Sequence, residues 1–275
     1  MNSKQTILTH SSVIPDVQSE HDSRKLPIDR VGVKRLRYPI YFEDKFGAQP
    51  VVATCAADIM LVAEQKGTHM SRLVALFEEM SAVTQKKPLR VGGLQEWVTR
   101  LLDSLHAQNG AIELLFTLFM RKTAPISKIE STINYEVRLY AECKNGVYCE
   151  KVSVSVPVTS LCPCSKRISD YGAHNQRSVL TVSVVPKVPV FIADLVRVGE
   201  EEASSELFAL LKRVDEKYVT EYAYDHPRFV EDLVRAMAQR LIDDPRFAGF
   251  SVEAENFESI HNHSAYAKID FWQSL

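Results

Sequence analysis

Two cysteines and a histidine in the stretch LCPCSKRISDYGAHNQRSV (161–179) have side chains that could do chemistry. Cys162 and Cys164 are separated by one proline, and His174 follows in a glycine-bearing turn. Thiolate and imidazole are preferred zinc ligands, although structural zinc sites normally use Cys-x-x-Cys spacing. A loop that supplies cysteine and histidine, with a further ligand from elsewhere, suits a catalytic metal site with an open position. Two small apolar residues and a surface histidine explain the spacing equally well.

The two cysteines can also have separate roles, one binding a metal ion and the other reacting. A thiol beside cations is a better nucleophile or acid, and Lys166 and Arg167 follow the pair closely. Spacing does not decide which cysteine would take which role. The chain has five cysteines, an odd number that indicates no disulfide framework.

A second group of ionisable residues lies near the C-terminus, in ENFESIHNHSAY. Glu255, Glu258, His261 and His263 occur close together and interrupt a strand pattern. An extended backbone would place His261 and His263 on one face. Such a concentration at an irregularity indicates a site, whereas a solvated loop is the simpler interpretation of any single residue.

The segment KGTHMSRL (66–73) opens a predicted helix. Its backbone amides, with Thr68, Ser71 and Arg72, could hold a phosphate group. The segment lacks the P-loop pattern, so a nucleotide-hydrolysing motor or switch is not indicated. The alternative is a capping segment in which Thr68 or Ser71 caps the helix.

Composition narrows the class of protein. The chain has 275 residues, of which 45% are hydrophobic and 25% charged, as in globular proteins of one large or two ordinary domains. Its net charge of −2 does not favour a nucleic acid or an acidic membrane as partner. No apolar run approaches the roughly 20 residues that span a bilayer, and the polar start lacks a signal-peptide core. We therefore expect a cytoplasmic protein.

Hydrophobic periodicity predicts the elements that must position these residues. Strands are expected at 30–44, 50–64, 111–123, 129–143, 147–158 and 178–188, with a tight hairpin at Lys144–Gly146, and over 249–272 with an irregular middle. Helices are expected at 70–80, 94–110, 191–214 and 225–242. Most strands are joined as hairpins, which predicts an antiparallel sheet with helices packed on one face. The predicted class is α+β: a flexible N-terminal arm (1–27) and two related modules, 28–125 and 126–275. Glu216, expected after the third helix, and Glu231, on the last, look like ordinary solvent-facing glutamates.

Four motifs together resemble GTP cyclohydrolase type IB, the prokaryotic enzyme of folate and deazapurine synthesis. The motifs are IPDVQSEHDSRKLPIDRVGV, KGTHMSRL, LCPCSKRISDYGAHNQRS and ENFESIHNHSAYA, and the similarity runs from about residue 13 to 271. The resemblance implies tandem tunnelling-fold modules that associate into an oligomeric barrel. It also implies a homotetramer with active sites between subunits.

The resemblance implies that GTP and water give formate and 7,8-dihydroneopterin triphosphate. Cys162, His174 and Glu216 would hold one divalent metal ion (Zn, Mn or Fe), which would activate a water molecule for attack on guanine C8. Cys164 would transfer a proton to the opening ring or contact the C8 adduct, and His261 would be a further acid–base group. Glu231 would accept hydrogen bonds from the N1–H and 2-amino groups of guanine. The candidate cations for the triphosphate are Arg177, Lys66 and Arg72.

Two other functions compete with this interpretation. Another tunnelling-fold enzyme, such as the nitrile reductase of queuosine synthesis, would use a cysteine nucleophile and NADPH and would not need Cys162, His174 and Glu216 as metal ligands. A non-catalytic Cys-x-Cys module for metal storage or redox exchange would leave the KGTHMSRL and Glu231 matches unexplained.

Overall fold

Alternating burial along the strands produces a sheet that is covered on one face only. The computed structural model describes residue 18 and residues 20–272. In β5, Val152, Val154, Val156 and Val158 are buried, while the residues between them are partly exposed. Because neighbouring side chains point to opposite faces of a strand, this pattern gives one apolar and one more polar face.

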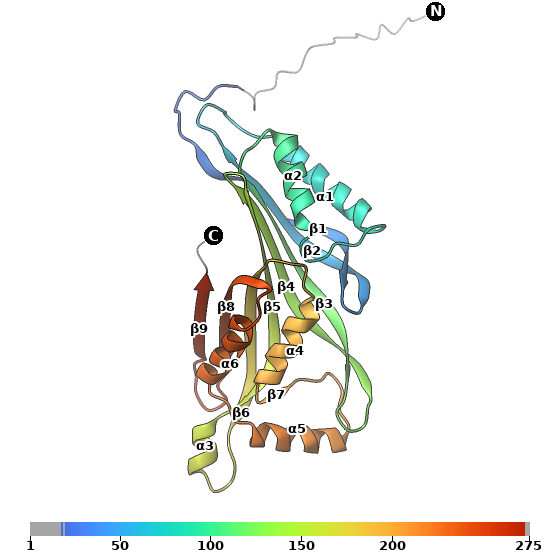
Figure 1. The fold of residues 1–275 in the computed structure, drawn as a ribbon, viewed down its shortest axis with the longest axis vertical. Helices are drawn as coiled ribbons and strands as arrows, with labels where there is room; N and C mark the ends of the chain where they lie inside the picture. The colour runs from blue at the N-terminus through green and yellow to red at the C-terminus, as the bar shows by residue number, and fades with distance from the viewer. Residues whose placement is uncertain (1–17, 19, 273–275) are drawn as a thin grey trace, which may run out of the picture.

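Within the described residues the chain forms nine strands and six helices (Figure 1). The strands are β1 (Ile28–Asp44), β2 (Gly47–Leu61), β3 (Gly110–Thr123), β4 (Glu130–Lys144), β5 (Val147–Leu161), β6 (Asn175–Pro186), β7 (Ser205–Glu206), β8 (Phe247–Asn256) and β9 (Ala265–Trp272). The helices are α1 (Met70–Thr84), α2 (Leu94–Leu105), α3 (Pro163–Ile168), α4 (Ile192–Glu202), α5 (Arg213–Asp225) and α6 (Val230–Ile242).

The strands build one continuous antiparallel sheet in the order β1-β2-β3-β4-β5-β6-β8-β9, with the short β7 beside β5. Helices α1, α2, α4 and α6 pack on the apolar face, which we call the covered face (Figure 1). The predicted α+β class, with an antiparallel sheet and helices on one face, is confirmed. The two halves of the chain share this sheet through the pairing of β3 with β4.

The prediction of one helix over 191–214 was wrong. α4 ends at Glu202, and the chain then forms β7, which pairs with β5. The Ser204 hydroxyl oxygen accepts a hydrogen bond from Leu161 N (3.1 Å), and Leu207 O accepts one from Lys122 Nζ (2.8 Å). These long-range hydrogen bonds hold residues 204–207 against β5 and β3 instead of in a helix. A new helix, α5, therefore begins only at Arg213. Glu216 consequently lies in the first turn of α5 rather than after a helix.

Asp215 explains where α5 begins. Its buried carboxylate accepts hydrogen bonds from Lys212 N, Ile126 N, Ser127 N and Ser127 Oγ, at distances of 2.9, 2.9, 2.8 and 2.6 Å. Burial alone raises the pKa of Asp215, but these hydrogen bonds outweigh it and hold the pKa below its usual range. The first turn of α5 is thereby tied to the connection between β3 and β4.

The described end of the expected flexible arm is paired with another segment. Three backbone hydrogen bonds, each 3.0 Å long, join it to the connection after β2: Asp22 N to Glu64 O, Lys66 N to Glu20 O and Gly67 N to Gln18 O. The remainder of the arm lies outside the described residues. Among the helices that the structure describes, none is long and apolar enough to cross a lipid bilayer.

Candidate active site

The sheet brings Cys162 and His174 together. Leu161, at the end of β5, pairs with Asn175, at the start of β6, and the Cys162 amide donates to the His174 carbonyl oxygen at 3.1 Å. The two residues are twelve positions apart in sequence. Cys162 directly precedes α3, which lies at the lower end of the sheet in Figure 1. Backbone pairing between β5 and β6 therefore brings the two residues together, as their order in the sequence predicted.

A short helix sets the direction of the two cysteines. Cys162 immediately precedes α3, and its Sγ accepts a hydrogen bond from Ser165 N at 3.5 Å. Pro163 suits the first turn because a proline there lacks only an amide that the helix does not use. The Ser165 hydroxyl bonds to Cys162 O and to His174 N, both at 3.2 Å. Cys164 is the second residue of α3 and is exposed, so its thiol is accessible to a substrate.

The His174 ring has a defined partner. Its Nδ1 lies 3.0 Å from Oε1 of Gln176, a side chain only 8% exposed. With the amide oxygen as acceptor, Nδ1 carries the proton and Nε2 keeps its lone pair for a metal ion. Gln176 was missed from the sequence, although residues two apart on a strand share a face.

The C-terminal loop begins beside the same histidine. Phe257 N donates to Arg177 O at 3.1 Å, and Glu258 Oε2 lies 3.9 Å from His174 Nδ1. Glu258 belongs to the predicted C-terminal group of ionisable residues, for which no individual role of Glu258 was predicted. His261 and His263 are exposed in the following bend, where their rings stack at 5.1 Å.

Glu231 lies near this end of the sheet, on the second residue of α6. Arg228 N donates to Leu161 O at 3.0 Å, which places the start of α6 beside the end of β5. Glu231 itself is exposed. Lys166, considered above as a cation beside the thiols, instead donates to Tyr224 O and lies 4.2 Å from the centre of the Tyr224 ring.

Glu216 is not gathered with Cys162 and His174 within one chain. α5 meets α3 through Tyr224, and Glu216 lies eight residues earlier in that helix, about 12 Å along its axis. In the part of the chain that the structure describes, no three His, Cys, Asp or Glu side chains are placed to hold a metal ion. The ligand role of Glu216 stays a prediction.

Lys66 and Arg72 lie at the opposite end of the sheet. Ile59 pairs with Gly110, which pairs with Cys143, which pairs with Tyr148, so these four residues form one row across the strands. Leu161 is 13 residues beyond Tyr148 along β5, or about 43 Å at 3.3 Å per residue. Lys66 and Arg72 follow β2 beyond this row, in the other direction. Within one chain they cannot share a ligand with Cys162.

The three candidate cations for the triphosphate differ in their surroundings. Lys66 Nζ is 2.6 Å from Glu20 Oε2, and Arg72 donates to Ser104 O at 2.7 Å. Arg177 is exposed on β6 between two buried neighbours, so it points to the uncovered face. The structure thus brings only Arg177 to the end of the sheet that carries Cys162.

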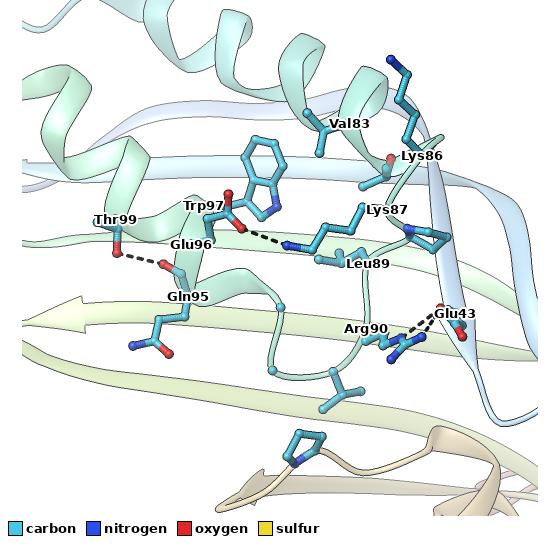
Figure 2. A pocket seen from close by; sticks show the side chains of 16 residues that line it. Glu43, Val83, Lys86, Lys87, Leu89, Arg90, Gln95, Glu96, Trp97 and Thr99 are labelled. Atoms are coloured by element: carbon cyan, nitrogen blue, oxygen red, sulfur yellow. Dashed lines mark hydrogen bonds and ion pairs between the residues drawn. The ribbon is translucent and has the colours of Figure 1, made fainter.

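A cavity of about 860 Å³ lies elsewhere, among α1, α2 and the loop between them (Figure 2). Its walls carry the ion pairs Arg90–Glu43 (2.6 Å) and Lys87–Glu96 (3.6 Å). None of the predicted site residues lines it. The cavity is therefore separate from the Cys162–His174 pair.

This sheet with helices on one face is a tunnelling fold of the urate oxidase kind. A hyper-thermostable AgUricase mutant has a TM-score of 0.50 to this chain at 7% identity, covering 90% of this chain and 93% of its own. At that identity the similarity shows the fold alone.

The sequence comparisons are more specific. A family model described as "Type I GTP cyclohydrolase folE2" matches residues 14–267. GTP cyclohydrolase FolE2 of Paraburkholderia phymatum is 54% identical over 261 residues, covering 94% of this chain and 95% of its own. GTP cyclohydrolase FolE2 of Ralstonia nicotianae is 51% identical over 258 residues, covering 94% of each chain. The chain belongs to the type I GTP cyclohydrolase FolE2 family.

Proposed function

We propose that this protein is a GTP cyclohydrolase of folate synthesis that opens the guanine imidazole ring at C8. Its products are formate and 7,8-dihydroneopterin triphosphate. Family membership over residues 14–267 supports the reaction. The observation that carries the site is the adjacency of Cys162 and His174, joined by a 3.1 Å backbone hydrogen bond.

The donor chemistry of this pair fits a divalent metal ion. Thiolate and imidazole suit zinc, and a carboxylate as third donor also admits manganese or iron. When bound, the ion supplies the Lewis acidity that activates water. Cys162 Sγ and His174 Nε2 would hold it, since Nδ1 is engaged by Gln176. Glu216 is the predicted third ligand, and Glu258, whose Oε2 lies 3.9 Å from His174 Nδ1, is another carboxylate, which lies near the pair.

The remaining residues act on the substrate. Cys164, exposed at the start of α3, transfers a proton to the opening purine ring, and His261 is a second acid–base group. Glu231 accepts hydrogen bonds from guanine N1–H and the 2-amino group, which discriminates against adenine. Arg177 contributes positive charge for the triphosphate.

A complete site is formed between copies of the chain, in a homotetramer. Lys66 and Arg72 lie about 40 Å from Cys162 within one chain, so a second copy brings them to the site. In the described residues β1 and β9 are the two edges of the sheet: β9 pairs with β8, and β1 pairs with β2 and is bridged on its outer side to Leu89 at Phe42. Unpaired edges are templates for further strands. Edge-to-edge pairing of copies closes a barrel, with two tandem modules contributed by each chain.

Formate release from GTP tests the activity. The metal-loaded protein should release formate and give a product that becomes fluorescent after oxidation to neopterin. A chelator should stop turnover, and an added divalent ion should restore it, because the ion activates the attacking water. Undiminished turnover by protein shown to be metal-free would contradict the metal-dependent proposal, and absence of formate would contradict the reaction.

Mixed oligomers test the shared site. Lys66→Ala/Arg72→Ala and Cys162→Ala subunits, each nearly inactive alone, should regain activity when co-expressed. Random assembly would leave about a quarter of the sites with both native ends. The matched control co-expresses Cys162→Ala with His174→Ala, which damage the same end and should restore nothing. Equal inactivity of both mixtures, with mixed oligomers present, would place the whole site within one chain.

A further inference from the structure

A cluster of buried polar side chains lies on the covered face, on the adjacent strands β5, β6 and β8, close in sequence to Cys162. Ser160 and Asn256 are each 3% exposed, and Ser178 is fully buried. Along β5 the same face carries Val152, Val154, Val156 and Val158 immediately before Ser160. Burying polar groups among apolar side chains costs free energy unless they are hydrogen-bonded. Ser160 and Asn256, which are hydrogen-bonded, therefore call for a role other than packing, whereas Ser178 Oγ has no hydrogen-bond partner among the described residues.

Their hydrogen bonds form a chain that joins three elements. Asn256 Nδ2, at the end of β8, donates to Ser160 Oγ at 3.1 Å. The Ser160 hydroxyl, near the end of β5, donates to Arg228 O at 3.2 Å. Arg228 N in turn donates to Leu161 O at 3.0 Å. Both backbone polar groups of Arg228 are thus bound to β5, immediately before α6 begins.

Each member of this chain lies a few residues before a member of the proposed site. Ser160 precedes Cys162 by two residues, and Asn256 precedes Glu258 by two. Arg228 precedes Glu231 by three. The buried chain therefore connects the backbone segments that carry the thiol, the guanine-binding carboxylate and the C-terminal loop.

We propose that Ser160 and Asn256 are positioning residues that set Glu231, and hence the guanine base, relative to the reactive end of β5. This inference rests on the proposed function. A serine hydroxyl has one proton. Because Asn256 donates to the serine oxygen, that proton is left for Arg228 O. The pair thereby holds the start of α6 in one position.

The position of Glu231 matters most for the 2-amino group of the base. A carboxylate that accepts from both N1–H and the 2-amino group needs both oxygens aligned with the ring edge. If the start of α6 shifts, one of the two hydrogen bonds weakens first. Selectivity for GTP over inosine triphosphate, which lacks the 2-amino group, should then fall together with affinity.

Steady-state kinetics of Ser160→Ala and Asn256→Asp, with GTP and with inosine triphosphate, test the inference. Ser160→Ala should raise KM for GTP about tenfold, with a smaller change in kcat, because the Arg228 carbonyl loses its partner. Asn256→Asp has the same shape, but its carboxylate accepts from the Ser160 hydroxyl instead of donating to it, so the hydroxyl turns away from Arg228 O and the same change is expected. In both variants the GTP preference should shrink.

Ser178→Ala is the matched control. It removes a hydroxyl from the same buried layer, but Ser178 Oγ has no hydrogen-bond partner among the described residues. Unchanged KM and selectivity in this variant would support the inference. It would be overturned if Ser178→Ala behaved like Ser160→Ala, or if folded Ser160→Ala and Asn256→Asp kept native KM and selectivity. Glu231→Gln distinguishes the role of Glu231 in binding guanine from its positioning by Ser160 and Asn256. Normal selectivity for GTP in Glu231→Gln would refute the role of Glu231 itself.

Discussion

Replacing Cys164 by alanine is expected to abolish formate release while leaving the metal content unchanged. The exposed thiol at the start of α3 is close in sequence to the Cys162–His174 pair, but in our proposal it transfers a proton and binds no metal. Loss of a positioned general acid or base lowers turnover by about 10² to 10⁴-fold. Single-turnover formate assays, with metal analysis of the same preparation, measure both quantities.

Cys143→Ala is a suitable control for this experiment. Cys143 is also a free thiol, but it pairs with Gly110 and Tyr148 at the other end of the sheet. Its removal should leave turnover and metal content unchanged. If Cys164→Ala turned over GTP at the native rate, the proposed division of roles between the two cysteines would be wrong.

Replacing Cys162 by alanine is expected to remove the metal ion and, with it, turnover. The Cys162 thiolate is the softer donor of the pair. Residues that only hydrogen-bond to a metal ligand contribute about 10 to 100-fold in metal affinity, so loss of a ligand itself should lower the affinity by more than about 100-fold. Competition with a chromophoric chelator measures the affinity directly. The result does not depend on any assay of the reaction.

Two comparisons make the metal experiment specific. Cys164→Ala should compete for metal as the native protein does. Glu216→Ala and Glu258→Ala should differ from each other, because only one of these carboxylates is needed to complete a set of three ligands. Native metal affinity in folded Cys162→Ala would exclude this thiol as a ligand.

Most of the sheet was predictable because strand burial is a local pattern. The alternation in β5 and the hairpin at Lys144–Gly146 follow from residues close in sequence. The end of α4 was not predictable in this way. It depends on hydrogen bonds that Ser204 Oγ and Leu207 O accept from Leu161 N and Lys122 Nζ, which are far away in sequence. Helical periodicity alone extended that helix too far.

The residues of the candidate site were likewise only partly predictable from the sequence. The residue types and their order indicated Cys162 and His174, and a loop between two adjacent strand ends was enough to bring them together. Gln176 had a weak signal, as the residue two positions after His174. Ser160 and Asn256 had none, because the hydrogen bonds that give them a role join residues 96 and 68 positions apart.

The amino-acid sequence by itself determined the family, the alternating strands and the candidate side chains for the proposed metal and guanine sites. Only the tertiary structure decided which of those side chains lie at the same end of the sheet. The physical reason is that a long strand carries residues close in sequence tens of ångströms apart, whereas strand pairing places distant residues side by side. That is why Cys162 and His174 are neighbours, while Lys66 and Arg72 lie at the opposite end of the sheet.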